Sequence, residues 1–336
     1  MTDRTHIDAN AHPAGGALPD SLPFTHAPAA ADPILERALL AVGRTRTLGL
    51  HFYGNFIGMG GMGGRPAPLG TTRLSVDGEP PDSGTPGVSA VALATLADLA
   101  IGSAIRSHVG VGARMATATL SIQHPIAPVS GPVLGLGEAV PVDGAQKSGR
   151  CSLVGPDGKA VGYAHGWFAP LPPPAGWVPN PLPWERETLP PILVPPLYDL
   201  DAREASAVAA ARTAGERARA HGTSISEELL HFRWDAAEPG QARGVLTNGP
   251  ELANRVGHIQ GGALYGAAAL VAAQALGAPL SLLVDGHYQF LRIADGALLH
   301  GEATVLRRGR LASFVEARLS VDGKTVGVGL YSFRSA

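Results

Sequence analysis

A glycine-rich polar stretch in the second half of the chain has the residue types needed to bind a carbonyl oxygen. Asn254 and Gln260 carry side-chain amides, and Gly261 and Gly262 lead directly into the apolar run 263–277. Glycine lets backbone N–H groups come close to a ligand, because no Cβ stands in the way. The first N–H groups of a helix lack intrahelical partners and carry partial positive charge, so they can stabilise a developing oxyanion. The alternative interpretation is a turn that only starts a buried helix.

A single carboxylate interrupts a long apolar run in the first half of the chain. Asp98 is the only charged residue of the run 88–105. Burying a carboxylate is costly unless it is hydrogen-bonded or protonated. Two interpretations follow. Asp98 lies on a solvated helix edge, or it lies at an interface and acts as a general base or a nucleophile.

These two stretches belong to an internal repeat. The segment Gly-Glu-Ala at 137–139 recurs at 301–303, and Asp-Gly-Lys-x-Val-Gly at 157–162 recurs at 322–327. Both pairs share an offset of about 165 residues, which indicates two copies of one unit. Each copy has a long apolar helix and several strand-like segments. We therefore expect an α+β fold in which an antiparallel sheet wraps each core helix.

The repeat and the proline content divide the chain into four parts. We expect a disordered or draped arm over 1–31, the first copy over 32–168, a stiff proline-rich linker over 169–200 and the second copy over 201–336. The expected helices are 32–42, 88–106, 201–221 and 263–276. The expected strands are 50–57, 72–76, 117–124, 133–140, 146–154 and 160–168, then 229–234, 244–247, 280–290, 297–306, 311–321 and 325–333.

Aligning the two core helices indicates that the copies have diverged in complementary ways. Ser89 aligns with Gln260, and Ala269 occupies the position that corresponds to Asp98. The first copy therefore keeps an acid but lacks the glycine pair. The second copy keeps the amides and the glycines but lacks the acid.

The stretch Asn254-x5-Gln260-Gly-Gly resembles the pattern Asn-x5-His-Gly-Gly-x7-Asp of hotdog-fold acyl-CoA thioesterases of the phenylacetyl-CoA and 4-hydroxybenzoyl-CoA type. The resemblance covers roughly residues 45–168 and 225–334. The second copy departs from the pattern at Gln260, where the family has His, and at Ala269, where it has Asp. The resemblance implies a tandem (double) hotdog that hydrolyses an acyl-CoA or acyl-carrier thioester.

The first copy resembles the same pattern where it keeps Asp98, but departs from it at Ser83, Ser89 and Ala90. In this family each site takes its acid from one hotdog unit and its glycine loop from the other. That rule implies one complete site per chain. It also implies that Ala269, with Ser83 and Ser89, forms an inactive second site.

The resemblance further implies roles for individual residues. The Gly261 N–H polarises the thioester carbonyl, and Asp98 activates water or attacks the carbonyl directly. Asn254 and Gln260 orient the substrate or the water. Thr117 resembles a water-holding hydroxyl, with an ordinary strand residue as the alternative. Contacts with coenzyme A are expected from Gly262, Arg307, Arg308 and Arg310. For the three arginines, a solvated turn is the alternative.

The histidines and the cysteine have weaker signals. His258 lies two residues before the position of the family His and could replace it, while His124 and His287 could line a pocket. Packing roles are the alternative for all three. Cys151 is the only cysteine, which excludes an intramolecular disulfide, fits a reducing cytosol and indicates an inert strand residue.

Charge and composition exclude several partners. The net charge is −2 without a basic block, which argues against nucleic acid. The run 88–105 is too short and too polar for a membrane span, and no metal-ligand spacing or signal peptide is present. We expect a cytoplasmic enzyme, without a metal or a cofactor other than the coenzyme A of its acyl-CoA substrate, that associates as a homodimer.

Two other functions fit parts of the pattern. A non-catalytic acyl-CoA or acyl-carrier binding module fits the missing family His and the degenerate second site. A hotdog hydratase or dehydratase requires an Asp/His pair, which the helix starts lack.

Overall fold

The structure is a computed structural model that describes residues 32–61, 67–79, 87–110, 113–125, 129–140, 147–171, 181–186, 188–235 and 238–335. The expected arm over 1–31, Ser83 and the linker segment 172–180 lie outside the described residues. Residues 32–336 form one compact unit.

Two apolar helices form the core, α3 (Ala90–Val109) and α6 (Gly261–Leu276). Both begin with a side-chain cap. The hydroxyl of Ser89 accepts from the third N–H of its turn, and the amide oxygen of Gln260 does the same for α6. The structure therefore confirms that these two residues occupy corresponding positions. α6 ends at Gly277, which adopts the left-handed conformation that favours glycine (φ 68).

The two core helices cross in direct contact because glycines line the crossing. A Cβ on Gly262 would lie 2.4 Å from the Cα of Thr95. A Cβ on Gly266 would lie 2.8 Å from a methyl carbon of Val91. Side chains at these glycines would force the helices apart, so Gly262 has a packing role in addition to any chemical one.

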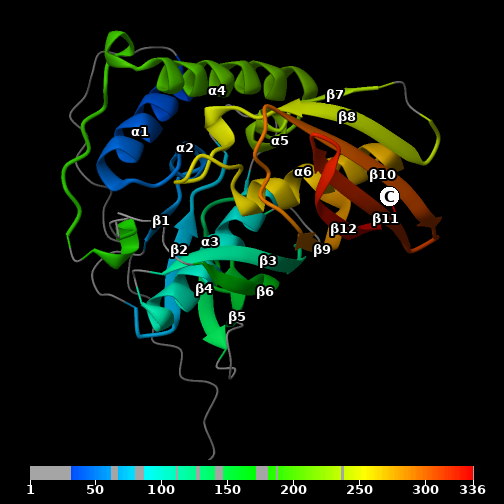
Figure 1. Ribbon diagram of the computed structural model, residues 1–336, viewed down its shortest axis with the longest axis horizontal. Coiled ribbons are helices and arrows are strands. Elements are labelled where there is room, and N and C mark those ends of the chain that lie inside the picture. The colour runs from blue at the N-terminus through cyan, green and yellow to red at the C-terminus, as the bar shows by residue number, and fades with distance from the viewer. Residues whose placement is uncertain are drawn as a thin grey trace, which may run out of the picture. The chain divides into compact units, whose positions relative to one another are not determined.

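One antiparallel sheet of 12 strands surrounds the helices, in the order β1-β2-β4-β5-β6-β3-β9-β12-β11-β10-β8-β7. α3 packs against β2 to β6, and α6 packs against β8 to β12. The halves join where β3 pairs with β9, from Thr119 opposite Gln289 to Gln123 opposite Asp285 (Figure 1). The strands of the first half are β1 (Gly60–Gly61), β2 (Thr71–Val76), β3 (Arg114–Gln123), β4 (Val133–Val140), β5 (Lys147–Val154) and β6 (Ala160–Leu171). Those of the second half are β7 (Phe232–Trp234), β8 (Gln241–Thr247), β9 (Leu283–Phe290), β10 (Leu298–Arg308), β11 (Ala312–Val321) and β12 (Lys324–Arg334).

Each half begins with a long helix and a short one. These are α1 (Pro33–Leu48) and α2 (Phe52–Phe56) in the first half, and α4 (Ala202–His221) and α5 (Ile225–Leu229) in the second. α1 packs on α4. Both halves then continue with two strands, the core helix and four more strands. Each half is thus an antiparallel sheet wrapped around one helix, and the chain is a tandem hotdog of the α+β class.

One expected strand, 50–57, is wrong, and two others, 229–234 and 280–290, begin later than expected. Residues 52–56 form the helix α2, because the His51 ring caps it by accepting from the Gly54 N–H at 2.9 Å. Phe52 and Phe56, four residues apart, then stack with ring centroids 5.7 Å apart. In the second half the expected strand 229–234 is reduced to β7, because α5 occupies its start.

The described part of the linker is ordered against the rest of the chain. It contains two 3-10 turns, η1 (Pro183–Glu185) and η2 (Leu197–Asp199). Arg46 of α1 pairs with Asp199 at 2.8 Å and with Glu204 of α4 at 2.6 Å. The proline-rich segment is therefore tied to both halves at this point.

α3 is the one helix of the described residues that is long and apolar enough to cross a membrane. In this structure, 78% of that stretch is buried inside the protein. The same test is passed by the core helices of soluble proteins.

Candidate active site

Asp98 lies on α3 and points at the start of α6. Its side chain is only 7% exposed, so the interpretation as a solvated helix edge is wrong. The carboxylate accepts from the Thr117 hydroxyl of β3 at 2.7 Å and from the Gln260 amide at 2.8 Å. Three elements from two halves therefore meet at one buried carboxylate.

Gln260 can present only one end of its amide to Asp98. Its Oε1 accepts from the Ala263 N–H at 2.8 Å and from the Thr95 hydroxyl at 3.3 Å. Because the Ala263 N–H can only donate, Oε1 must face it, and the amide NH2 must face the carboxylate. Thr95, which was not among the residues predicted from the sequence, lies beside this amide, and its hydroxyl also donates to the Val91 carbonyl oxygen at 3.0 Å. Its position three residues before Asp98 places it on the same helix face, but a lone threonine there is not a distinctive pattern.

The glycines allow the carboxylate to approach the end of α6. A Cβ on Gly261 would lie 2.7 Å from Asp98 Oδ2, so no other residue fits without moving the acid. The Gly262 N–H also interacts with the carboxylate. The positive end of the α6 dipole and the acid of the other half therefore face one another.

Burial raises the pKa of Asp98 from 3.8 to about 6. The Thr117 hydroxyl, the Gly262 N–H and the Gln260 amide oppose this rise, because each stabilises the ionised form. A carboxyl with this pKa is largely ionised at neutral pH and is a stronger base than an exposed aspartate.

Asn254 shapes the loop that precedes α6. Its side-chain oxygen accepts from the N–H groups of Val256 at 3.0 Å and His258 at 3.1 Å. The turn between them contains Gly257, whose positive φ (91) favours glycine. No described hydrogen bond joins Asn254 to Asp98, so its contacts are those of a loop-forming residue.

The basic hairpin tip lies at the other end of α6. Arg308 donates to the carbonyl oxygens of Leu276 at 3.0 Å and Ala275 at 3.5 Å, which caps the helix C-terminus. At 1.5 Å rise per residue, that end is roughly 22 Å from the end facing Asp98. Arg307 and Arg310 are exposed.

Three arginines that were not predicted from the sequence gather nearer the α6 loop. Arg106 lies on α3 two turns after Asp98 and pairs with Glu185 at 3.5 Å. Burial lowers the pKa of Arg255, with a further contribution from Arg106 and a smaller one from Arg186. The arginine cluster (Arg106, Arg186 and Arg255) comes from three distant segments, so no local pattern could have revealed it.

The remaining candidates do not contact Asp98 among the described residues. His124 shares a hydrogen bond with the Tyr265 hydroxyl at 3.0 Å, and His287 shares one with Ser121 at 2.5 Å. Burial raises the pKa of the Cys151 thiol to about 12, which makes it unreactive at neutral pH. The described part of the chain contains no group of three or more His, Cys, Asp or Glu side chains placed to hold a metal ion.

Comparisons with known proteins give structural similarity only. No protein-family model matches the chain, and no curated protein matches it. Among solved structures, an acyl-CoA thioesterase II from Mycobacterium marinum is 13% identical, with 79% of this chain and 93% of that chain covered and a TM-score of 0.43. A conserved protein of unknown function with a hot dog fold from Alicyclobacillus acidocaldarius is 14% identical, with 79% and 93% covered and a TM-score of 0.46. A phenylacetic acid degradation-related protein from Ralstonia eutropha is 29% identical, with 32% and 86% covered and a TM-score of 0.30.

Proposed function

We propose that this chain hydrolyses an acyl-CoA thioester at one composite site, formed by Asp98 of the first half and the start of α6 in the second. The observation that carries the proposal is the position of Asp98, buried and held by Thr117 and Gln260 at the N-terminus of α6. Hydrolysis of a thioester needs a base that activates water and hydrogen-bond donors that stabilise the oxyanion. A carboxylate beside a helix N-terminus can provide both.

The reaction follows from these positions. The thioester carbonyl oxygen takes up the Gly261 N–H as its negative charge develops. Asp98 accepts a proton from a water molecule held beside Thr117, and the water oxygen bonds to the carbonyl carbon. The C–S bond then breaks, and the proton on Asp98 passes to the departing thiolate or to solvent. Gln260 is an amide and cannot replace the family His as a base, so the proton transfer falls to Asp98.

Direct attack by Asp98 is the alternative route. It forms a mixed anhydride with the acyl group and releases the thiolate, and water then cleaves the anhydride. Incorporation of ¹⁸O into Asp98 during a single turnover in H2¹⁸O is evidence for the anhydride route. General-base catalysis places ¹⁸O only in the released acid, whereas attack by Asp98 followed by water addition at its carbonyl leaves ¹⁸O in the enzyme.

The arginine cluster supports coenzyme A as the thiol part of the substrate. Arg106 pairs with Glu185 at 3.5 Å, and Arg106, Glu185 and Arg186 all lie close enough to Arg255 to affect its charge. Guanidinium groups bind phosphates well, because they present several N–H donors in a fixed geometry. The hairpin tip of Arg307, Arg308 and Arg310 is the competing phosphate site. Arg255→Ala is expected to raise KM for acyl-CoA about tenfold while Arg310→Ala leaves it unchanged. The reverse result would move the coenzyme A site to the tip.

Binding without turnover is the second candidate function. It is favoured by one observation: both oxygens of Asp98 already accept hydrogen bonds from the protein. Thiol release from a panel of aliphatic and aromatic acyl-CoA substrates, measured beside acyl-CoA binding by calorimetry, separates the two. Saturable binding with no thiol release from any substrate would favour the binding module.

A further inference from the structure

A second helix start, that of α3, faces a cavity of about 80 Å³ between the two halves. Ser89 and Ala90 of α3 line it on one side, and Ser224, Glu227 and Ser281 of the second half line it on the other. This is the position where the resemblance implies an inactive counterpart of the Asp98 site. The side chains that line it nonetheless carry unused polar groups.

The first of these polar groups is the carboxylate of Glu79, in the segment before α3. Its Oε2 accepts from the Ser226 N–H at 3.3 Å. Its Oε1 is buried without a well-aligned hydrogen bond among the described residues, although the Ser226 and Ser89 hydroxyls lie close enough to the carboxylate to oppose the rise of its pKa on burial. An unpartnered buried carboxylate oxygen is costly, so this atom favours a ligand that donates a hydrogen bond.

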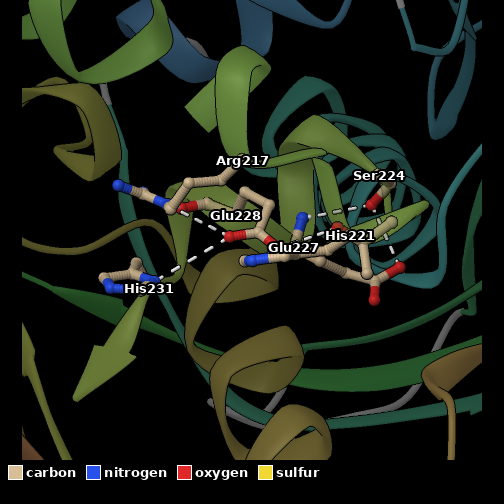
Figure 2. A network of polar contacts seen from close by, with 7 residues as sticks. Arg217, His221, Ser224, Glu227, Glu228 and His231 are labelled. Atoms are coloured by element: carbon tan, nitrogen blue, oxygen red, sulfur yellow. Dashed lines mark hydrogen bonds and ion pairs between the residues drawn. The ribbon is translucent and has the colours of Figure 1, made fainter. Parts of the chain in front are cut away.

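Glu227 of α5 brings the second carboxyl, and its neighbour Glu228 provides the contrast (Figure 2). Glu228 accepts from Arg217 at 3.1 Å and from His221 at 2.9 Å, so its charge is compensated. Glu227 accepts only from the Ser224 hydroxyl, at 3.0 Å, among the contacts the structure describes. Burial raises the pKa of Glu227 to about 7, with smaller contributions from Glu79 and Glu228.

His124 adds an independent sign of a ligand. Its side chain is 7% exposed and lines the cavity. Its Nε2 shares a hydrogen bond with the Tyr265 hydroxyl, whereas its Nδ1 is buried without a partner in the described residues. Burial lowers the pKa of His124 to about 3, so the ring is neutral and Nδ1 can accept a hydrogen bond.

The surroundings exclude an anionic ligand. A wider surface hollow of about 650 Å³ shares His124 with the cavity, and Asp157 lines it. Among the described residues, the charged ones that line the two spaces are all acidic: Glu79, Glu227 and Asp157, the last of which pairs with Lys159 at 3.3 Å. Arg37 is a cation whose charge lowers the pKa of Glu79 slightly. Its guanidinium donates to backbone carbonyl oxygens, including that of Gly78 at 2.8 Å. The phosphates of coenzyme A would be repelled here.

We propose that this acidic chamber (Glu79, Glu227 and His124 at the start of α3) binds a primary alkylammonium group. The ammonium has three donors, which match Glu79 Oε1, the Glu227 carboxylate and His124 Nδ1. The alkyl chain packs on Leu93 and Leu283, which also line the cavity, and leads toward the surface hollow. The chamber is distinct from the Asp98 site, and the inference does not depend on the proposed thioesterase activity.

Calorimetry and thermal unfolding with n-propylammonium chloride test the proposal, with sodium chloride at equal ionic strength as the reference. At about pH 8 the ammonium is protonated and Glu227 is largely ionised. We expect saturable binding and a rise in Tm. Propan-1-ol and propionate, which match the size but not the charge, should give neither effect. Equal effects from propan-1-ol would overturn the proposal.

Two variants locate the binding. Glu227→Gln keeps the shape and should weaken n-propylammonium at least about tenfold. Ser281→Leu adds bulk at an exposed wall position without touching a carboxylate and should also weaken it. Asp98→Asn should bind as wild type does. Unchanged affinity in both chamber variants, or loss of affinity in Asp98→Asn alone, would place the ligand elsewhere and refute the chamber.

Discussion

The starts of the two core helices differ far more than the folds around them. At α6 the cap is an amide, a glycine follows, and the acid comes from the opposite core helix, with Asp98 held by Gln260. At α3 the cap is Ser89, the next residue is Ala90, and the nearby carboxyls come from peripheral segments. The start of the core helix, which is the same position of the fold in both halves, thus has different charged residues around it in each half.

The difference teaches that a helix end becomes chemically specific through residues supplied by other elements. The N-terminal dipole is common to both helices. The arginine cluster lies near the start of α6, whereas the charged residues that line the chamber at α3 are acids in the part of the chain that the structure describes. The same dipole therefore serves a polyanionic thioester in one proposal and a small cation in the other.

Substitution of the residue that follows each N-cap should give the largest difference in activity between the two helix starts. Gly261→Ala places a Cβ within 2.7 Å of Asp98 Oδ2 and displaces the carboxylate. We expect thioester hydrolysis to fall about 10³-fold. Ala90→Gly at the corresponding place on α3 should leave hydrolysis unchanged and cost about 1 kcal/mol of stability. Similar activity losses in both variants would mean that the two helix starts are catalytically equivalent.

The burial of Asp98 against the start of α6 should lower the free energy of unfolding. The pKa of Asp98 rises from 3.8 in the unfolded chain to about 6 in the folded one, so the folded state holds a proton longer. Stability is therefore lost as the pH rises through this window, by about 3 kcal/mol once both forms are ionised. Asp98→Asn should be more stable than wild type above about pH 7 in urea unfolding, and this gain should shrink toward pH 4. A destabilised variant at high pH would contradict the assigned cost.

The neighbouring acids near α3 should respond in opposite ways. Glu228→Gln loses the charge that Arg217 and His221 compensate, and we expect a destabilisation of about 2 kcal/mol in chemical unfolding. Glu227→Gln removes an uncompensated carboxyl and should be neutral or stabilising. Equal losses would show that Glu227 is an ordinary structural partner of its segment.

A smaller effect is expected from Gln260 on the pH dependence of the hydrolysis rate. The wild-type rate should rise with pH to a midpoint near pH 6, because Asp98 must be ionised. Gln260→Ala removes a donor that stabilises the ionised form, so the midpoint should move to higher pH by less than about one unit. Ser89→Ala loses the matching cap on α3 and should keep the wild-type midpoint. A shift in both variants would reflect general destabilisation.

Local patterns were sufficient to predict much of the fold. The two apolar runs correspond to α3 and α6, and the recurring hairpin segments correctly indicated two similar halves. The prediction of a strand over 50–57 was wrong, because the spacing of Phe52 and Phe56 suits a short helix as well as a strand. The cap formed by His51 favours the helix.

The environment of the site was less predictable. Asp98 and the Gly261 loop carry signals in their own segments, one as a lone acid and the other as a glycine pair. Thr95, the arginine cluster and the acidic chamber depend on which distant segments meet in space. A threonine in an apolar helix or a glutamate before one has no distinctive spacing, so only the packing of the two halves identifies them.

The most direct test of the composite site is the initial rate of acyl-CoA hydrolysis by Asp98→Asn relative to wild type. Asp322→Asn is the matched control, because Asp322 lies on a surface turn with positive φ (48), which asparagine tolerates. A composite site that depends on Asp98 predicts a fall of about 10³-fold in kcat for Asp98→Asn and an unchanged kcat for the control. An Asp98→Asn variant that folds and hydrolyses acyl-CoA within about twofold of the wild-type rate would contradict it.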